Sequence, residues 1–182
     1  MRKRDILIFS FSMVFLLVSA CTTNQSLQEY FVENAENPNF ISLDVPSSML
    51  PLINEHLHTA QEKALQSVNK VNVLAFKKNV ENEREFTVQK QQVSAILANS
   101  KFTELIKLNT PYGKGVVKFL GTEDAIDEVI IYGSRDDMGF ALIRILGNDM
   151  DAASIASLVQ AAQQATFKGD GLPQLGAFFN AK

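Results

Sequence analysis

The sequence predicts an α+β fold: a largely antiparallel sheet with helices packed on one face, as a two-layer sandwich. Helical and strand-like segments alternate in the first half of the chain. Residues 85–99 then carry the apolar stripe of an amphipathic helix. Four strand-like runs follow with only short turns between them. Short turns join antiparallel neighbours, and such a sheet gains a core when helices cover it.

The first elements follow from apolar spacing. Leu27, Tyr30 and Phe31 predict a helix that ends before Pro38. Residues 40–45 and 71–76 alternate as strands, which either pair or flank another strand through a helical crossover. Between them we expect a helix through Met49, Leu50, Ile53 and Leu57, and a short helix over 59–68. Residues 77–84 are predicted to form a loop.

The four later strands are expected over 102–108, 116–120, 125–132 and 140–146. Turns are predicted at 111–113, 121–122 and 133–137, and residues 147–149 should end the last strand. Asp149 or Asp151 would then cap a final helix marked by Ile155, Leu158, Val159 and Ala162. The predicted organisation is a signal peptide over 1–20, a tether over 21–26, a single α+β domain over 27–165 and an irregular tail over 166–182.

Residues 1–20 have the layout of a secretory signal. Basic Arg2, Lys3 and Arg4 precede an apolar run from Ile6 to Leu17, and the small residues Ser19 and Ala20 follow. A permanent membrane-spanning helix needs about 20 apolar residues, and this run is shorter.

The segment from Leu17 to Cys21 reads Leu-Val-Ser-Ala-Cys and resembles the lipobox of bacterial lipoproteins. The resemblance implies cleavage before Cys21 and lipidation of this cysteine, which would anchor the protein to the membrane because several acyl chains hold far more strongly than one. Thr22 resembles the sorting pattern of Gram-negative outer-membrane lipoproteins, which implies an outer-membrane protein that faces the periplasm. The alternative is ordinary secretion with one free thiol.

Charge argues against a nucleic-acid partner. The chain has 17 basic and 20 acidic residues, and the predicted signal peptide holds three of the basic and one of the acidic ones. Proteins that bind phosphate backbones need clustered Lys and Arg, so we expect no nucleic acid among the partners.

Several predicted strand cores share one pattern, namely residues 41–46 leading to Met49, and 73–76, 102–106, 126–131 and 140–150. With these segments the chain resembles the DUF4252 family of bacterial lipoproteins over about residues 28–160. None of these segments is a catalytic signature. The resemblance implies a small envelope lipoprotein of unassigned activity and adds no site residue.

The sequence gives little support for a metal site or for a nucleophilic active site. His56 and His58 are two residues apart and would point to different faces of a helix, and spacing supplies no third ligand. No Gly-x-Ser-x-Gly elbow occurs, and residues 113–115 sit between strands as a hairpin turn and do not open a helix as a phosphate loop does. Residues 148–151 lack the ligands of an EF-hand loop. We therefore expect no cofactor.

Acidic pairs occur at Glu123-Asp124, Asp127-Glu128 and Asp136-Asp137. Two carboxylates across one cleft can hydrolyse a glycan, but these pairs sit in or beside turns, where Asp supplies turn hydrogen bonds.

Two apolar features point to an interaction surface. Residues 129–132, which end at Tyr132, are apolar at consecutive positions, so we expect both sheet faces to be covered, one by helices and the other by something else. Phe178 and Phe179 adjoin in the tail and either pack on the protein's own sheet or dock on a partner. The sequence thus favours a non-enzymatic, lipid-anchored module that binds an envelope protein or ligand. The alternatives are a periplasmic hydrolase using carboxylates and a purely structural surface protein, and the oligomeric state is left open.

Overall fold

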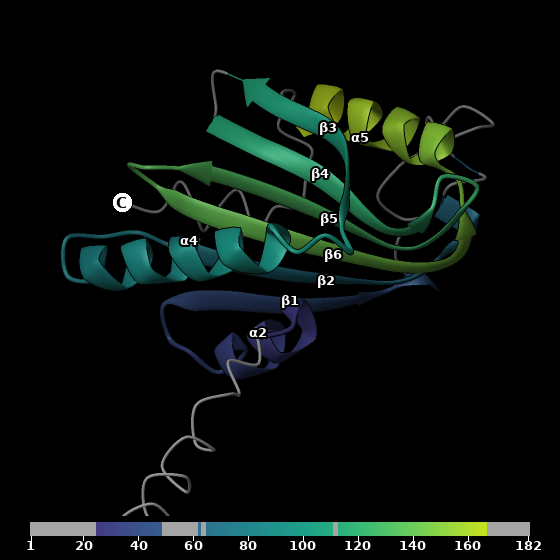
Figure 1. Cartoon of the computed structure of the whole chain (residues 1–182). Helices are drawn as coiled ribbons and strands as arrows, with labels where there is room; N and C mark the ends of the chain where they lie inside the picture. The colour runs from purple at the N-terminus through teal and green to yellow at the C-terminus, as the bar shows by residue number, and fades with distance from the viewer. Residues whose placement is uncertain (1–24, 49–61, 63–64, 111–112, 167–182) are drawn as a thin grey trace, which may run out of the picture.

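Six antiparallel strands form one sheet in the order β1-β2-β6-β5-β4-β3 (Figure 1). The computed structural model describes residues 25–48, 62, 65–110 and 113–166. The strands are β1 (Phe40–Pro46), β2 (Val68–Lys77), β3 (Thr103–Thr110), β4 (Gly113–Thr122), β5 (Ala125–Arg135) and β6 (Gly139–Met150). The helices are α2 (Leu27–Asn34), α4 (Glu83–Leu97) and α5 (Ala152–Thr166). The predicted α+β class and the antiparallel sheet are confirmed.

The helices lie on both faces of the sheet. Successive strand residues point to opposite faces, so Ile130 packs with α2 and α4 whereas Val129 packs with α5. We call these the α4 face and the α5 face; Figure 1 shows the two helices on opposite sides. The prediction of helices on one face is therefore wrong for α5. Both faces are covered, as expected, but the second face is covered by a helix, α5, which contributes Ile155 and Val159, and not by something other than helices.

Aromatic rings fill the core on the α4 face. Phe140 is 1% exposed and stacks on Phe76 with ring centroids 5.6 Å apart and an interplanar angle of 9°. Phe40, Phe86 and Tyr132 surround the same ring at 5.9 to 6.2 Å. These contacts join β1, β2, β5, β6 and α4 around one side chain.

The last strand continues further than expected. Residues 147–149 do not end it, because Met150 returns to pair with Ile126 after an irregularity in the register. Asp149 adopts φ 51° in this stretch, and Met150 is 1% exposed within the core of the α5 face. Burial of Met150 therefore favours continued pairing over an early turn. Of the two predicted caps, Asp151 caps α5, since its Oδ1 accepts from the Ser154 amide at 2.8 Å.

Other boundaries shift for similar reasons. β2 starts at Val68, inside the predicted helix 59–68, because Val68 is buried and pairs with Gly147. Gly121 and Thr122 belong to β4, and the turn falls on the next two residues. Gly113 to Gly115 also lie in β4 rather than in a turn. The helix expected through Met49 to Leu57 lies outside the described residues.

The first helix begins with a capping box. The Glu29 amide donates to Ser26 Oγ at 3.2 Å, and the Ser26 amide donates to Glu29 Oε2 at 2.7 Å. Two of the free amides at the helix start are thereby satisfied, which fixes where the helix begins. None of the helices in the described part of the chain is long and apolar enough to span a membrane.

Candidate functional site

A groove lies between the second half of α4 and strands β3 and β4, with a volume of about 490 Å³. We call it the α4–β4 groove. Ser94, Leu97 and Ala98 form its helix side, and Tyr132 of β5 lines it. Its sheet side includes three lysines and one carboxylate, namely Lys107, Lys114, Lys118 and Glu104.

Strand register brings the lysines together around Val116. Lys114 and Lys118 are two residues on either side of Val116 along β4, so all three side chains point to the α4 face. Lys107 of β3 pairs directly with Val116, and Tyr132 of β5 pairs with it from the other side. The register shift between Glu104 and Ile106 places Glu104 opposite Lys118 on this same face. The groove therefore combines an apolar centre with a surplus of positive charge.

The three lysines are held differently. Lys118 Nζ donates to the carbonyl of Leu97 at 2.6 Å and so satisfies a free carbonyl at the end of α4. Lys107 Nζ lies 3.4 Å from Glu104 Oε1, with the two side chains 79% and 45% exposed. Lys114 has no carboxylate within ion-pair distance in the part of the chain that the structure describes. Lys107 and Lys114 are thus the lysines most open to a bound anion, while Lys118 has one of its three N–H donors engaged.

Tyr132 was predicted as part of an interaction surface, and the structure buries most of it. The residue is 9% exposed, and its ring belongs to the aromatic core. Among the described residues, its hydroxyl has no partner at normal hydrogen-bond geometry. Burial raises the pKa of this hydroxyl, and the neighbouring Ser134 side chain opposes the shift only in part. Tyr132 therefore forms a wall of the groove rather than an exposed aromatic patch.

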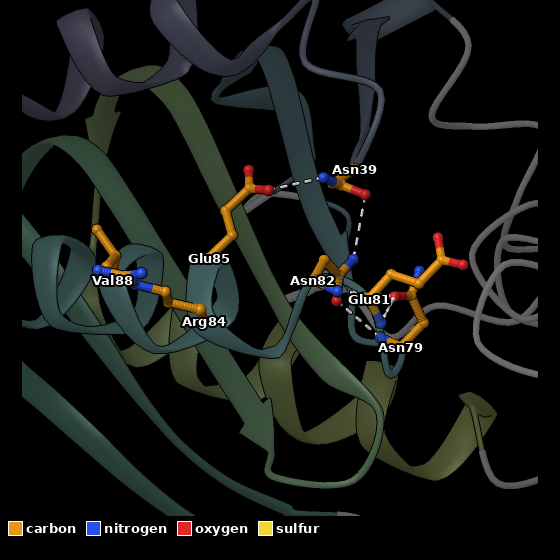
Figure 2. A pocket seen from close by; sticks show the side chains of 7 residues that line it. All are labelled: Asn39, Asn79, Glu81, Asn82, Arg84, Glu85 and Val88. Atoms are coloured by element: carbon orange, nitrogen blue, oxygen red, sulfur yellow. Dashed lines mark hydrogen bonds between the residues drawn. The ribbon is translucent and has the colours of Figure 1, made fainter.

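A second hollow of about 500 Å³ lies at the start of α4 and is lined largely by amide and charged side chains (Figure 2). Asn82 is 7% exposed and donates to Asn39 Oδ1 at 3.1 Å and to the Lys77 carbonyl at 2.9 Å. Asn39 in turn donates to Glu85 Oε2 at 2.7 Å. These polar groups satisfy one another, so the network joins the start of β1 and the end of β2 to α4.

A buried ion pair also lies on the α4 face. Arg144 of β6 donates through Nε and Nη2 to the two oxygens of Glu128 of β5, each at 2.9 Å. The side chains are 16% and 9% exposed. This bidentate geometry satisfies the carboxylate fully and holds two central strands in register.

A protein-family match covers all six strands of the sheet. The model of the family described as "Domain of unknown function (DUF4252)" matches residues 30–158. The chain belongs to this family. The matched segment includes every residue of the α4–β4 groove and the buried ion pair. No curated protein and no solved structure matches the chain.

Within this DUF4252 domain the predicted acidic pairs do not act as pairs. Glu123 and Asp124 form the β4–β5 turn. Asp127 is exposed whereas Glu128 is buried, because neighbouring strand residues point to opposite faces.

The last pair, Asp136 and Asp137, lies in the β5–β6 turn, where each carboxylate binds a different basic side chain. Arg135 lowers the pKa of Asp137 to about 2, and Lys90 lowers the pKa of Asp136. A general acid requires a raised pKa, so neither group is set up for that role.

The other predicted site residues lie elsewhere. Cys21, His56, His58, Phe178 and Phe179 fall outside the described residues. No three potential metal ligands among His, Cys, Asp and Glu gather within the described part of the DUF4252 domain. The α4–β4 groove was not predicted from sequence. The alternation of Lys114, Val116 and Lys118 along one strand could have indicated it, had the register of that strand with its neighbours been known.

Proposed function

We propose that this protein is a lipid-anchored component of the bacterial cell envelope that binds another envelope protein and catalyses no reaction. The observation that carries the binding role is the α4–β4 groove, where lysines gather on the surface of a protein whose overall charge is negative. A local surplus of positive charge on a negatively charged protein favours specific recognition of a partner over a general contribution to solubility. In the groove as described, Glu104 is the single carboxylate, which does not supply the two carboxylates of a glycosidase.

The anchor is proposed from the Leu-Val-Ser-Ala-Cys segment ending at Cys21. Thr22 supports an outer-membrane location with the domain in the periplasm. The capping box at Ser26 fixes the start of α2 five residues after Cys21, a stretch that reaches at most about 17 Å. On this proposal the α2 end of the domain stays close to the bilayer.

Cys21→Ala is expected to abolish incorporation of labelled fatty acid and to move the protein from the membrane fraction to the soluble fraction, because the acyl chains supply the hold on the bilayer. Metabolic labelling and cell fractionation measure both effects. Gln25→Ala, four residues along, is the control and should leave the protein in the membrane. If Cys21→Ala stays in the membrane without label, the lipid anchor is wrong.

The binding role is tested by site-specific photo-crosslinking in intact cells. Ser94 and Thr87 are exposed on α4, two turns apart, and each hydroxyl donates to the carbonyl four residues earlier. Only Ser94 lines the α4–β4 groove. A photoreactive residue at 94 should therefore give one dominant crosslinked protein, and the same residue at 87 should not. Equal products at both positions, or none at 94, would contradict binding through the groove.

A further inference from the structure

We propose that the α4–β4 groove receives an extended acidic segment of its partner protein, one carboxylate of which sits between Lys107 and Lys114. This inference rests on the proposed binding role and adds the chemistry of the ligand. Lys107 pairs with Val116, and Lys114 lies two residues before Val116 on the same face. They are diagonal neighbours across two strands, which places their Cα atoms about 7 Å apart. Two ammonium groups at this spacing can share one carboxylate.

The neighbouring positions fit an extended chain. Residues two apart along a strand lie about 6.6 Å apart on the same face. If one carboxylate lies between Lys107 and Lys114, a side chain two residues further along the ligand reaches Val116 and the apolar wall made by Leu97 and Ala98. The side chain after that approaches Lys118. The matching pattern is acidic, apolar, acidic at alternate positions.

Glu104 acts as an internal competitor. Its carboxylate is 3.4 Å from Lys107 Nζ in an exposed pair, which contributes little to stability and exchanges easily. A carboxylate from the ligand takes its place beside Lys107. Removing the Glu104 charge should therefore strengthen ligand binding, a result that a purely structural role for these lysines does not produce.

The position of the groove favours a protein segment over lipid headgroups. The tethered helix α2 packs beside β1, where Tyr30 meets Phe40, at one edge of the sheet (Figure 1). The groove lies over β4 and β3, four strand spacings away from β1, or about 19 Å. The groove thus opens at the far edge of the sheet from the anchor. The segment 167–182 contains two lysines and one aspartate, so its charge does not complement the groove.

The test uses the mature lipidated protein in a non-ionic detergent and a fluorescein-labelled peptide with the sequence Glu-Ser-Val-Ser-Glu repeated twice. Fluorescence anisotropy should show binding that weakens as salt rises, and the matched peptide with Gln for Glu should not bind. The double variant Lys107→Gln/Lys114→Gln should weaken binding about tenfold, and Glu104→Gln should tighten it about threefold. Lys70→Gln removes one positive charge at β2, outside the groove, and should leave the affinity unchanged.

Three results would overturn the acidic segment. The first is equal binding of the Gln peptide, or of the acidic peptide to the double lysine variant. The second is lysine-dependent binding to vesicles of phosphatidylglycerol in place of the peptide. The third is a lysine-dependent dimer in sedimentation experiments, which would make a second copy the occupant. In each case the Ser94 crosslink tests the binding role separately: if it persists to another protein, only the chemistry of the ligand is wrong.

Discussion

Phe140→Ala is expected to reduce the free energy of unfolding by about 4 kcal/mol, the largest single effect that the structure predicts. The side chain is 1% exposed and contacts rings from β1, β2, β5 and α4. Its removal leaves a cavity lined by rigid rings that belong to four separate elements. Such a cavity closes poorly, so the lost dispersion contacts add to the lost hydrophobic transfer energy.

Urea unfolding followed by circular dichroism measures this loss. Phe31→Ala is the matched control, because Phe31 packs against the edge of the same core and is only partly buried. Its loss should be about half as large. A loss below about 1 kcal/mol for Phe140→Ala, with an unchanged dependence on denaturant, would show that the aromatic core is not packed as described.

Breaking the Glu128–Arg144 pair has the second largest expected effect. Glu128→Leu leaves the Arg144 guanidinium without its carboxylate in a site where it is 16% exposed, so we expect a loss of about 3 kcal/mol. Glu128→Leu/Arg144→Leu should recover most of that loss, because two apolar side chains of similar volume avoid the uncompensated charge.

The exposed Lys70–Asp44 pair is the control. Its side chains are 44% and 60% exposed, and Lys70→Leu should cost less than about 1 kcal/mol. The measurement is the urea midpoint for the three variants and the original protein. A double variant as unstable as Glu128→Leu would mean that Arg144 stabilises the fold through contacts other than its pair with Glu128.

Much of the fold could be predicted because local sequence patterns determine where its strands and helices lie. Strand alternation and short turns located all six strands, and the apolar stripe located α4 within two residues at either end. The side of the sheet that α5 covers could not be predicted in this way. An amphipathic stripe shows that a helix buries one side but does not identify the sheet face it meets, and here the irregular backbone at Asp149 precedes the helix.

The candidate site was harder to predict because it depends on register. Lys107, Lys114 and Tyr132 lie on three strands, and a shift of one residue in any strand would move its side chain to the other face. Glu128 illustrates the same difficulty. In sequence it adjoins Asp127 and resembles half of an acidic pair, whereas in the sheet its partner is Arg144, 16 residues away. Single-sequence patterns identify strands but not which residues become neighbours across them.

The strand order also constrains how the protein forms as it is made. β2 pairs on one side with β1, which is close in sequence, and on the other with β6, which begins at Gly139. During N-to-C-terminal synthesis, the edge of Val73 to Phe76 that pairs with β6 stays open until more than 60 further residues have followed. These residues are fully buried in the finished protein. The chain therefore carries residues that end fully buried with one edge still unpaired until β6 has been made, and this delay leaves β2 open to pairing with other chains unless a chaperone covers it.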